Sequence, residues 1–243
     1  MNTAAGSTRE AEGFRFTSGV RRRLVQIAGL ILVQALALFA SAGTLHWAEG
    51  WAYLGFYVLL IGLNAALIVP RGAVGSTLVE ERSRAGGMRG WDKAFAAVYG
   101  LSGMAILVIA GLDERLAWSG PVAAWLQVLA FGVMCLGYGL FSWSMAVNAF
   151  FSARVRIQAD RGHQVVDRGP YAAVRHPGYA GAVISALTLP VMLGSAWALL
   201  PAASVVVSVI VRTVLEDRTL LAELEGYEDY SHRVRYRLVP GIW

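Results

Sequence analysis

The sequence has little of what builds most soluble proteins. Only 15% of its 243 residues are charged, against about a quarter in a soluble domain, while 56% are hydrophobic. The single cysteine, Cys135, lies inside an apolar run, which excludes a disulfide framework and a cysteine-based metal site. Lysine is almost absent, since Lys93 is the only one among 21 basic residues. This composition favours an integral membrane protein.

The arginines lie in short clusters between apolar runs. A net charge of +5 is compatible with nucleic-acid binding, but such clustering is typical of membrane topology, so we expect no nucleic-acid partner. We also expect no cleaved signal peptide, because the first apolar run has no small-residue cleavage site and further runs follow it. The low lysine content and the abundance of alanine, glycine and arginine are typical of a GC-rich bacterium.

Six apolar segments predict the fold class, an all-α membrane protein with about six transmembrane helices. A helical crossing takes roughly 20 residues, and four segments are long enough: 24–42, 51–69, 94–112 and 122–149. Two shorter segments, 179–193 and 196–211, predict a tight hairpin joined by Gly194 and Ser195; partial insertion of this hairpin remains an alternative. Six crossings place 20 basic residues on one side and only Arg115 on the other. The protein is then multi-pass, with both termini in the cytoplasm, and we expect it in a bacterial inner membrane.

Glycines in the fourth segment predict close helix packing. These are Gly132, Gly137 and Gly139. On the opposite side of the membrane, Asp113 and Glu114 form an acidic pair that we expect to be solvated.

The polar residues gather in the stretch 148–181 and at the end of the last apolar segment. The stretch is rich in Arg, His, Gly and Pro, and a loop of this length indicates a function. Arg212 and Glu216 are spaced i, i+4, which puts both on one helix face. They are either functional groups at membrane depth or an interfacial arginine with a surface partner. We expect no metal site, because the nearby histidines lack carboxylates at ligand spacing.

These residues resemble the isoprenylcysteine carboxyl methyltransferase family, whose relatives include membrane phospholipid methyltransferases. The resemblance lies in GPYAAVRHPGYAG, RTVLED and LEGYEDYSHRVRYRLVPGIW and covers 148–243. Hydropathy and this resemblance together divide the chain into a cytoplasmic N-terminal segment (1–23), N-terminal transmembrane helices (24–147) and a catalytic methyltransferase region (148–243). The resemblance implies a largely enclosed, cytoplasmic S-adenosylmethionine pocket between the loop, the hairpin and the C-terminal segment. The cofactor-binding positions that it implies are Gln158, His163, Gln164, Val165, Val166, Tyr171, His176, Pro177, Gly178, Tyr179 and Glu216.

The same resemblance implies catalytic roles for Arg212 and Glu216. Arg212 would bind the substrate, and Glu216 would contact the cofactor. We expect methyl transfer to a lipid-like or small apolar acceptor within the membrane lipids. A carboxylate is the acceptor group that we expect, because it is already ionised at neutral pH and needs no general base.

Two other functions stay open from the sequence. The tail VRYRLVPGIW is similar to that of NADPH-dependent membrane reductases of the sterol type. A non-catalytic transporter or scaffold is the other, although a transporter predicts internal repeats and broken helices near the midplane, and the sequence has no convincing repeat.

Overall fold

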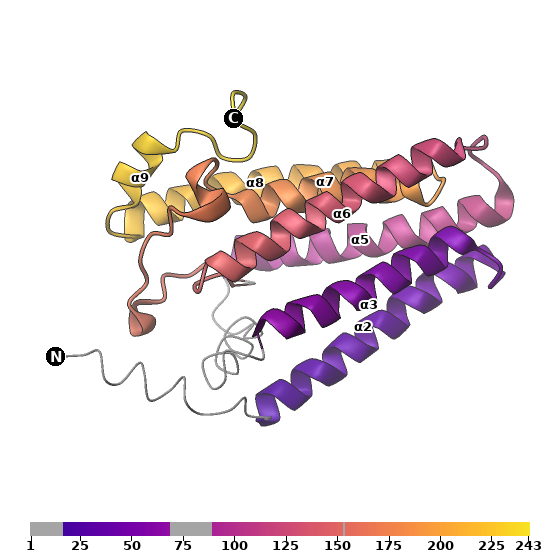
Figure 1. Ribbon diagram of the computed structural model, residues 1–243, viewed down its shortest axis with the longest axis horizontal. Helices are drawn as coiled ribbons and strands as arrows, with labels where there is room; N and C mark the ends of the chain where they lie inside the picture. The colour runs from indigo at the N-terminus through magenta and orange to yellow at the C-terminus, as the bar shows by residue number, and fades with distance from the viewer. Residues whose placement is uncertain (1–16, 69–88, 153) are drawn as a thin grey trace.

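The computed structural model describes residues 17–68, 89–152 and 154–243, and within these ranges its regular secondary structure consists of helices, without strands. The long helices run side by side along one axis (Figure 1). They are α2 (Ser18–Ala42), α3 (Ala48–Ile68), α5 (Gly90–Leu116), α6 (Ala124–Val147), α7 (Pro177–Met192) and α8 (Leu199–Glu223). The short elements are the 3-10 turns η2 (Ala159–Arg161) and η3 (Gly169–Ala172) and helix α9 (Tyr227–Arg233).

The described part of the chain supports a multi-pass membrane protein. Four of its helices, α2, α5, α6 and α8, are each long and apolar enough to cross a bilayer. The six predicted spans are therefore supported only in part: α3 is not among the four, and α7 has 16 residues, about 24 Å of helix. Residues 1–16 of the N-terminal segment, Val69 and most of the basic loop after it lie outside the described residues.

Several helices extend beyond the apolar segments that predicted them. Helix α2 begins at Ser18 rather than at residue 24, because the Thr17 side chain caps it by accepting a hydrogen bond from the Val20 N–H at 3.2 Å. Helix α8 continues to Glu223 rather than ending at residue 211. Hydropathy marks where apolar surface ends, but the backbone hydrogen bonds of a helix continue into its polar flank.

The connection between α7 and α8 is longer than predicted. It covers residues 193–198 rather than Gly194 and Ser195 alone, and Gly194 turns the chain with a positive φ of 78°. Pro201 lies in the first turn of α8, where a missing N–H leaves no helical hydrogen bond unmade.

The apolar surface of the bundle faces outward as well as inward. Large side chains on four different helices are strongly exposed, among them Leu59, Leu101, Leu136 and Val207. A soluble monomer rarely exposes so much contiguous apolar surface, whereas hydrocarbon around the bundle would cover it.

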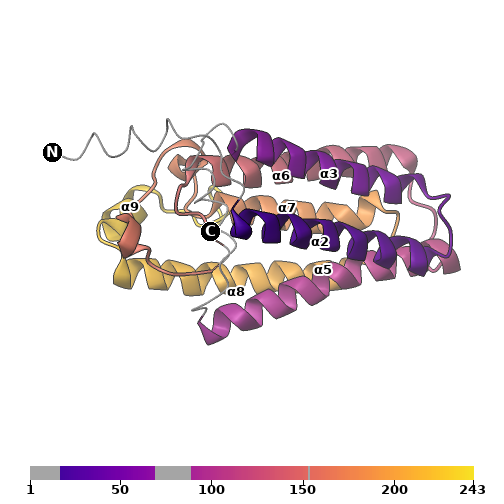
Figure 2. The same ribbon diagram turned by 90° about the horizontal axis from the view of Figure 1, so that it is seen from below.

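Helix α7 lies in the middle of the bundle between α6 and α8 (Figure 2). A Cβ added at Gly137 of α6 would come within 2.6 Å of the Ser185 hydroxyl and 2.9 Å of the Gly181 carbonyl oxygen, so this glycine lets α6 approach α7 as predicted. Gly132 and Gly139 have no neighbour within 4 Å of such a Cβ. The packing role expected for these two was wrong, because they face away from α7.

A buried carboxylate holds together the end of the bundle that carries the α5–α6 and α7–α8 connections. Asp113 is only 4% exposed, so the expectation that it is solvated was wrong. Its Oδ1 accepts the Ser119 N–H at 2.6 Å, and its Oδ2 accepts the hydroxyls of Ser119 (2.5 Å) and Ser195 (2.6 Å). Three hydrogen bonds to neighbouring turns replace the water that we expected around it.

Candidate active site

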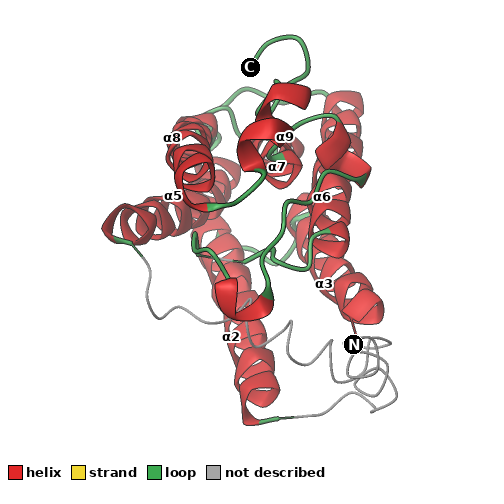
Figure 3. Cartoon of the chain, turned by 90° about the vertical axis from the view of Figure 1, so that its left-hand side faces the viewer, coloured by secondary structure: helices red, strands yellow, loops and turns green. Residues whose placement is uncertain are grey.

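The opposite end of the bundle carries a cleft. The connector from α6 to α7, the end of α8 and helix α9 meet there (Figure 1). Seen from that end, α9 covers the start of α7, with α8 on one side and α6 on the other (Figure 3). The space between their side chains, counted together with the open solvent at its mouth, is about 790 Å³.

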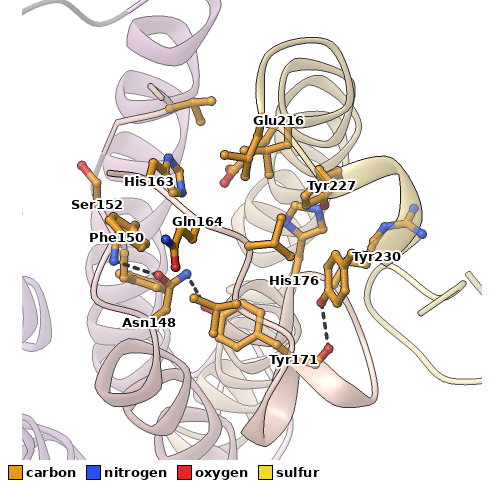
Figure 4. A pocket seen from close by; sticks show the side chains of 18 of the residues that line it. Asn148, Phe150, Ser152, His163, Gln164, Tyr171, His176, Glu216, Tyr227 and Tyr230 are labelled. Carbon is orange, nitrogen blue, oxygen red and sulfur yellow. Dashed lines mark hydrogen bonds between the residues drawn. The ribbon is translucent and has the colours of Figure 1, made fainter. Parts of the chain in front are cut away.

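Most of the residues singled out in the sequence line this cleft, from three separate segments. Glu216 comes from α8, and its carboxylate faces across the cleft towards His163 and Gln164 on the connector (Figure 4). The predicted cofactor positions that line the cleft are His163, Gln164, Val165, Val166, Tyr171, His176, Gly178, Tyr179 and Glu216.

Gln158, Pro177 and Arg212 lie behind the lining instead. The Gln158 side chain is 2% exposed and supports the connector, donating to the Phe150 carbonyl at 2.7 Å and accepting from Arg161 at 2.5 Å. Pro177 is the first residue of α7, where a fixed φ suits the helix start. These two positions shape the walls rather than the surface of the cleft.

Hydrogen bonds to the end of α6 and to α9 set the path of the connector. Asn148 ends α6, and its side chain accepts the Phe150 N–H at 2.8 Å and donates to the Tyr171 hydroxyl at 3.3 Å. Gly169, with a φ of 60°, precedes Pro170 in turn η3. The Tyr230 hydroxyl donates to the Tyr171 carbonyl at 2.7 Å (Figure 4), which joins α9 to this turn.

Asp217 is the centre of a buried ionic cluster beside the cleft, and the sequence did not predict it. Arg175 binds both of its oxygens at 2.9 Å in a bidentate pair, and Arg237 donates to Oδ2 at 2.9 Å. His176 (3.2 Å) and the Tyr227 hydroxyl (2.9 Å) donate to Oδ1. One carboxylate with 1% exposure therefore fastens the start of α7, helix α9 and the C-terminal segment to α8.

Glu216 and Asp217 are adjacent in sequence but opposite in role. Neighbouring helical residues are separated by about 100° around the axis, so Asp217 points into the ionic cluster and Glu216 points towards the cleft. The Glu216 side chain keeps 22% exposure. It accepts a short hydrogen bond from the Tyr179 hydroxyl, and it is the acidic residue of α8 that lines the cleft.

Arg212 lies one turn before Glu216, as their spacing predicted, with Nε 3.8 Å from the Glu216 carboxylate. It is 4% exposed, and its Nε donates to the Tyr179 hydroxyl at 2.7 Å. Its NH1 also pairs with Asp92 of α5 at 3.0 Å, a partner that could not be predicted from the sequence. A buried arginine with three partners is not a snorkelling side chain. The alternative interpretation, an interfacial arginine with a surface partner, was therefore wrong.

The protonation states around the cleft follow from burial and neighbouring charge. Burial, followed by the charges of Arg156 and Arg161, lowers the pKa of His163 below its ordinary value. Burial raises the pKa of Tyr227 and Tyr230. At neutral pH the tyrosines are therefore hydrogen-bond donors and His163 is uncharged.

The part of the chain that lies in and beside the cleft also matches known proteins. Residues 128–222 match the isoprenylcysteine carboxyl methyltransferase (ICMT) family. The protein-S-isoprenylcysteine O-methyltransferase of Schizosaccharomyces pombe is 32% identical over 111 residues, which is 44% of this chain and 47% of the yeast protein. The chain thus aligns with about half the length of this relative. The matched residues include α7 and most of α6 and α8, so this part of the chain is similar to the isoprenylcysteine carboxyl methyltransferase family.

Proposed function

We propose that the protein transfers a methyl group from S-adenosylmethionine to the carboxylate of a lipid-like acceptor at the cleft. The observation that carries this proposal is the position of Glu216, an accessible carboxylate beside Tyr179 and Arg212, within the residues that match the family. The yeast relative is named for an S-isoprenylcysteine acceptor, so a prenylated cysteine with a free carboxylate is the first acceptor to test.

The lining suits the proposed cofactor. A purine and a thioether chain need aromatic and apolar contacts, and the cleft offers Phe150, Phe151 and Val165. An ammonium or sulfonium group needs a nearby anion or an aromatic face, and Glu216 and Tyr179 supply both. Gln158 and Pro177 would contribute by holding the wall that the cofactor contacts.

Methyl transfer to an ionised carboxylate would require no proton transfer by the protein. When bound beside Glu216 and Tyr179, the cofactor would supply an electrophilic methyl group to an acceptor oxygen and would leave as S-adenosylhomocysteine, with the electron pair of the broken C–S bond on sulfur. Arg212 would orient the acceptor carboxylate, and Glu216 would balance the charge of Arg212 and bind the cofactor. Most of the rate gain would come from holding the two reactants in line.

We further propose that the cleft end faces the cytoplasm and that six helices cross a bacterial inner membrane, with both termini on the cytoplasmic side. The basic clusters of the sequence support this orientation. In the structure, the connector, α9 and the C-terminal segment all lie at the cleft end (Figure 1). A lipid-like acceptor would reach the cleft from the surrounding membrane lipids.

The NADPH-dependent reductase is not favoured, because both comparisons point to methyltransferases. Titration of the detergent-purified protein with S-adenosylhomocysteine, with NADPH in parallel, separates the two. We expect saturable binding of S-adenosylhomocysteine only, weakened at least tenfold in Glu216→Ala. We expect Arg212→Ala to abolish methyl transfer to a prenylated cysteine and to retain S-adenosylhomocysteine binding. Binding of NADPH alone, or normal turnover by Arg212→Ala, contradicts the proposal.

A further inference from the structure

Helix α5 provides a seat for Arg212, formed by Asp92 and Phe95. Asp92 pairs with the Arg212 NH1 at 3.0 Å, and the guanidinium carbon lies 4.2 Å from the centre of the Phe95 ring. The two residues are spaced i, i+3 in the first turns of α5 and therefore share one helix face. One holds the charge of Arg212 and the other its planar face.

The seat is itself fixed. Asp92 is fully buried, and its second oxygen accepts the backbone N–H of Val155 at 2.9 Å. Val155 belongs to the connector and lines the cleft. Asp92 thus faces two segments: one oxygen forms an ion pair with Arg212 on α8, without hydrogen-bond geometry, and the other accepts a hydrogen bond from the connector.

Holding α5 against α8 does not require a buried ion pair, because an exposed pair joins the same two helices. Arg89 pairs with Glu223 across the same two helices at 2.6 Å, and both side chains are about two-fifths exposed. Burying a carboxylate completely costs free energy unless it is paired. An exposed pair already joins these ends, so the buried Asp92 points to a requirement for the geometry of Arg212.

We propose that Asp92, assisted by Phe95, is a positioning residue that fixes the guanidinium of Arg212 in the orientation used for the acceptor carboxylate. Both residues lie outside the matched segment 128–222. The inference rests on the proposed role of Arg212 and adds to it a functional contribution from the N-terminal helices. Asp92 acts through Arg212 and touches neither reactant.

Asparagine is the informative replacement at position 92. It keeps the size of aspartate but has one acceptor oxygen instead of two, so it must lose either Arg212 or the Val155 N–H. Asp92→Glu restores both oxygens on a side chain one methylene longer. Glu223→Gln is the matched control, because it breaks an ion pair between the same helices without touching Arg212.

The experiment observes Arg212 directly in ¹⁵N-arginine-labelled protein in detergent micelles. The Arg212 Nε–H signal is assigned by its loss in Arg212→Lys. We expect it to shift or broaden in Asp92→Asn, to recover partly in Asp92→Glu, and to stay unchanged in Glu223→Gln. Should Asp92→Asn fail to fold, Phe95→Leu, which keeps apolar volume and removes the ring face, should give a smaller change of the same kind.

Kinetics give the second readout. We expect kcat in Asp92→Asn to fall at least tenfold, while the Kd of S-adenosylhomocysteine changes less than threefold. An Arg212 signal that is absent in the wild type, or the same in wild type and Asp92→Asn, overturns the inference whatever the activity. If the Arg212 signal shifts in Asp92→Asn but the wild-type protein shows no methyl transfer, the proposed function is contradicted. The positioning of Arg212 by Asp92 is then still established.

Discussion

Helix α5 carries a buried aspartate near each end, and the two differ in what they hold. Asp113 accepts hydrogen bonds from the turns beside it, through Ser119 and Ser195. Asp92 holds a cation of α8 and a backbone N–H of the connector. The first contact closes the bundle, whereas the second fixes an arginine next to the cleft. Two buried aspartates of one helix thus differ in role: Asp113 is structural, and Asp92 is, by our inference, functional.

Asp217 should give the largest effect, because it combines both kinds of contact. Removing it in Asp217→Ala leaves Arg175 and Arg237 without their carboxylate, and breaking a buried pair in this way costs about 3–5 kcal/mol of folding free energy. We expect a lower midpoint of thermal unfolding in detergent together with loss of S-adenosylhomocysteine binding, since the cluster fixes the start of α7. Asp217→Ala with wild-type stability would show that the cluster does not hold this end together.

Asp113 should separate stability from function. Asp113→Asn loses at least one of its three hydrogen bonds, a cost of roughly 1–3 kcal/mol for buried groups left unpaired. We expect a lower unfolding midpoint but a kcat and an S-adenosylhomocysteine Kd within about twofold of the wild type. If its kcat fell in parallel with that of Asp92→Asn, the two ends of α5 would not differ in the way we infer.

His163 should show the smallest effect, through pH. Its folded-state pKa lies below its ordinary value, so the folded protein binds this proton less readily than the unfolded chain. Stability is then complete above the ordinary histidine pKa of about 6.5 and falls as the pH drops towards the folded-state pKa. The unfolding midpoint should fall more between pH 7.5 and 5.5 in the wild type than in His163→Gln. Equal shifts would assign the pH dependence to other groups.

The sequence predicted the helices and their order because hydropathy is a local property. It predicted their ends less well. The arginines at 21–23 precede the apolar run and were assigned to the cytoplasmic N-terminal segment, although Thr17 caps the helix that contains them. Likewise the third apolar segment was predicted to begin at residue 94, which left Asp92 outside it, although Asp92 lies in the first turn of α5.

The cleft was predictable where its residues are close in sequence. The resemblance implied nine of the lining residues, and the i, i+4 spacing predicted the contact between Arg212 and Glu216. The partners of Arg212 and Asp217 could not be predicted in this way. Asp92 and Arg212 are separated by 120 positions, and the contacts of Asp217 come from three segments. No periodicity in one sequence records which distant helices will pack together.

The close approach of α6 and α7 makes the mildest replacement one of the harshest. Alanine is ordinarily well tolerated in a helix, but at Gly137 its methyl group would press on the Gly181 backbone and force the two helices apart. Both lead directly into the cleft, α6 through Asn148 and α7 through His176. A single methyl group deep in the bundle would therefore be felt as a misalignment at its far end, where the cleft opens.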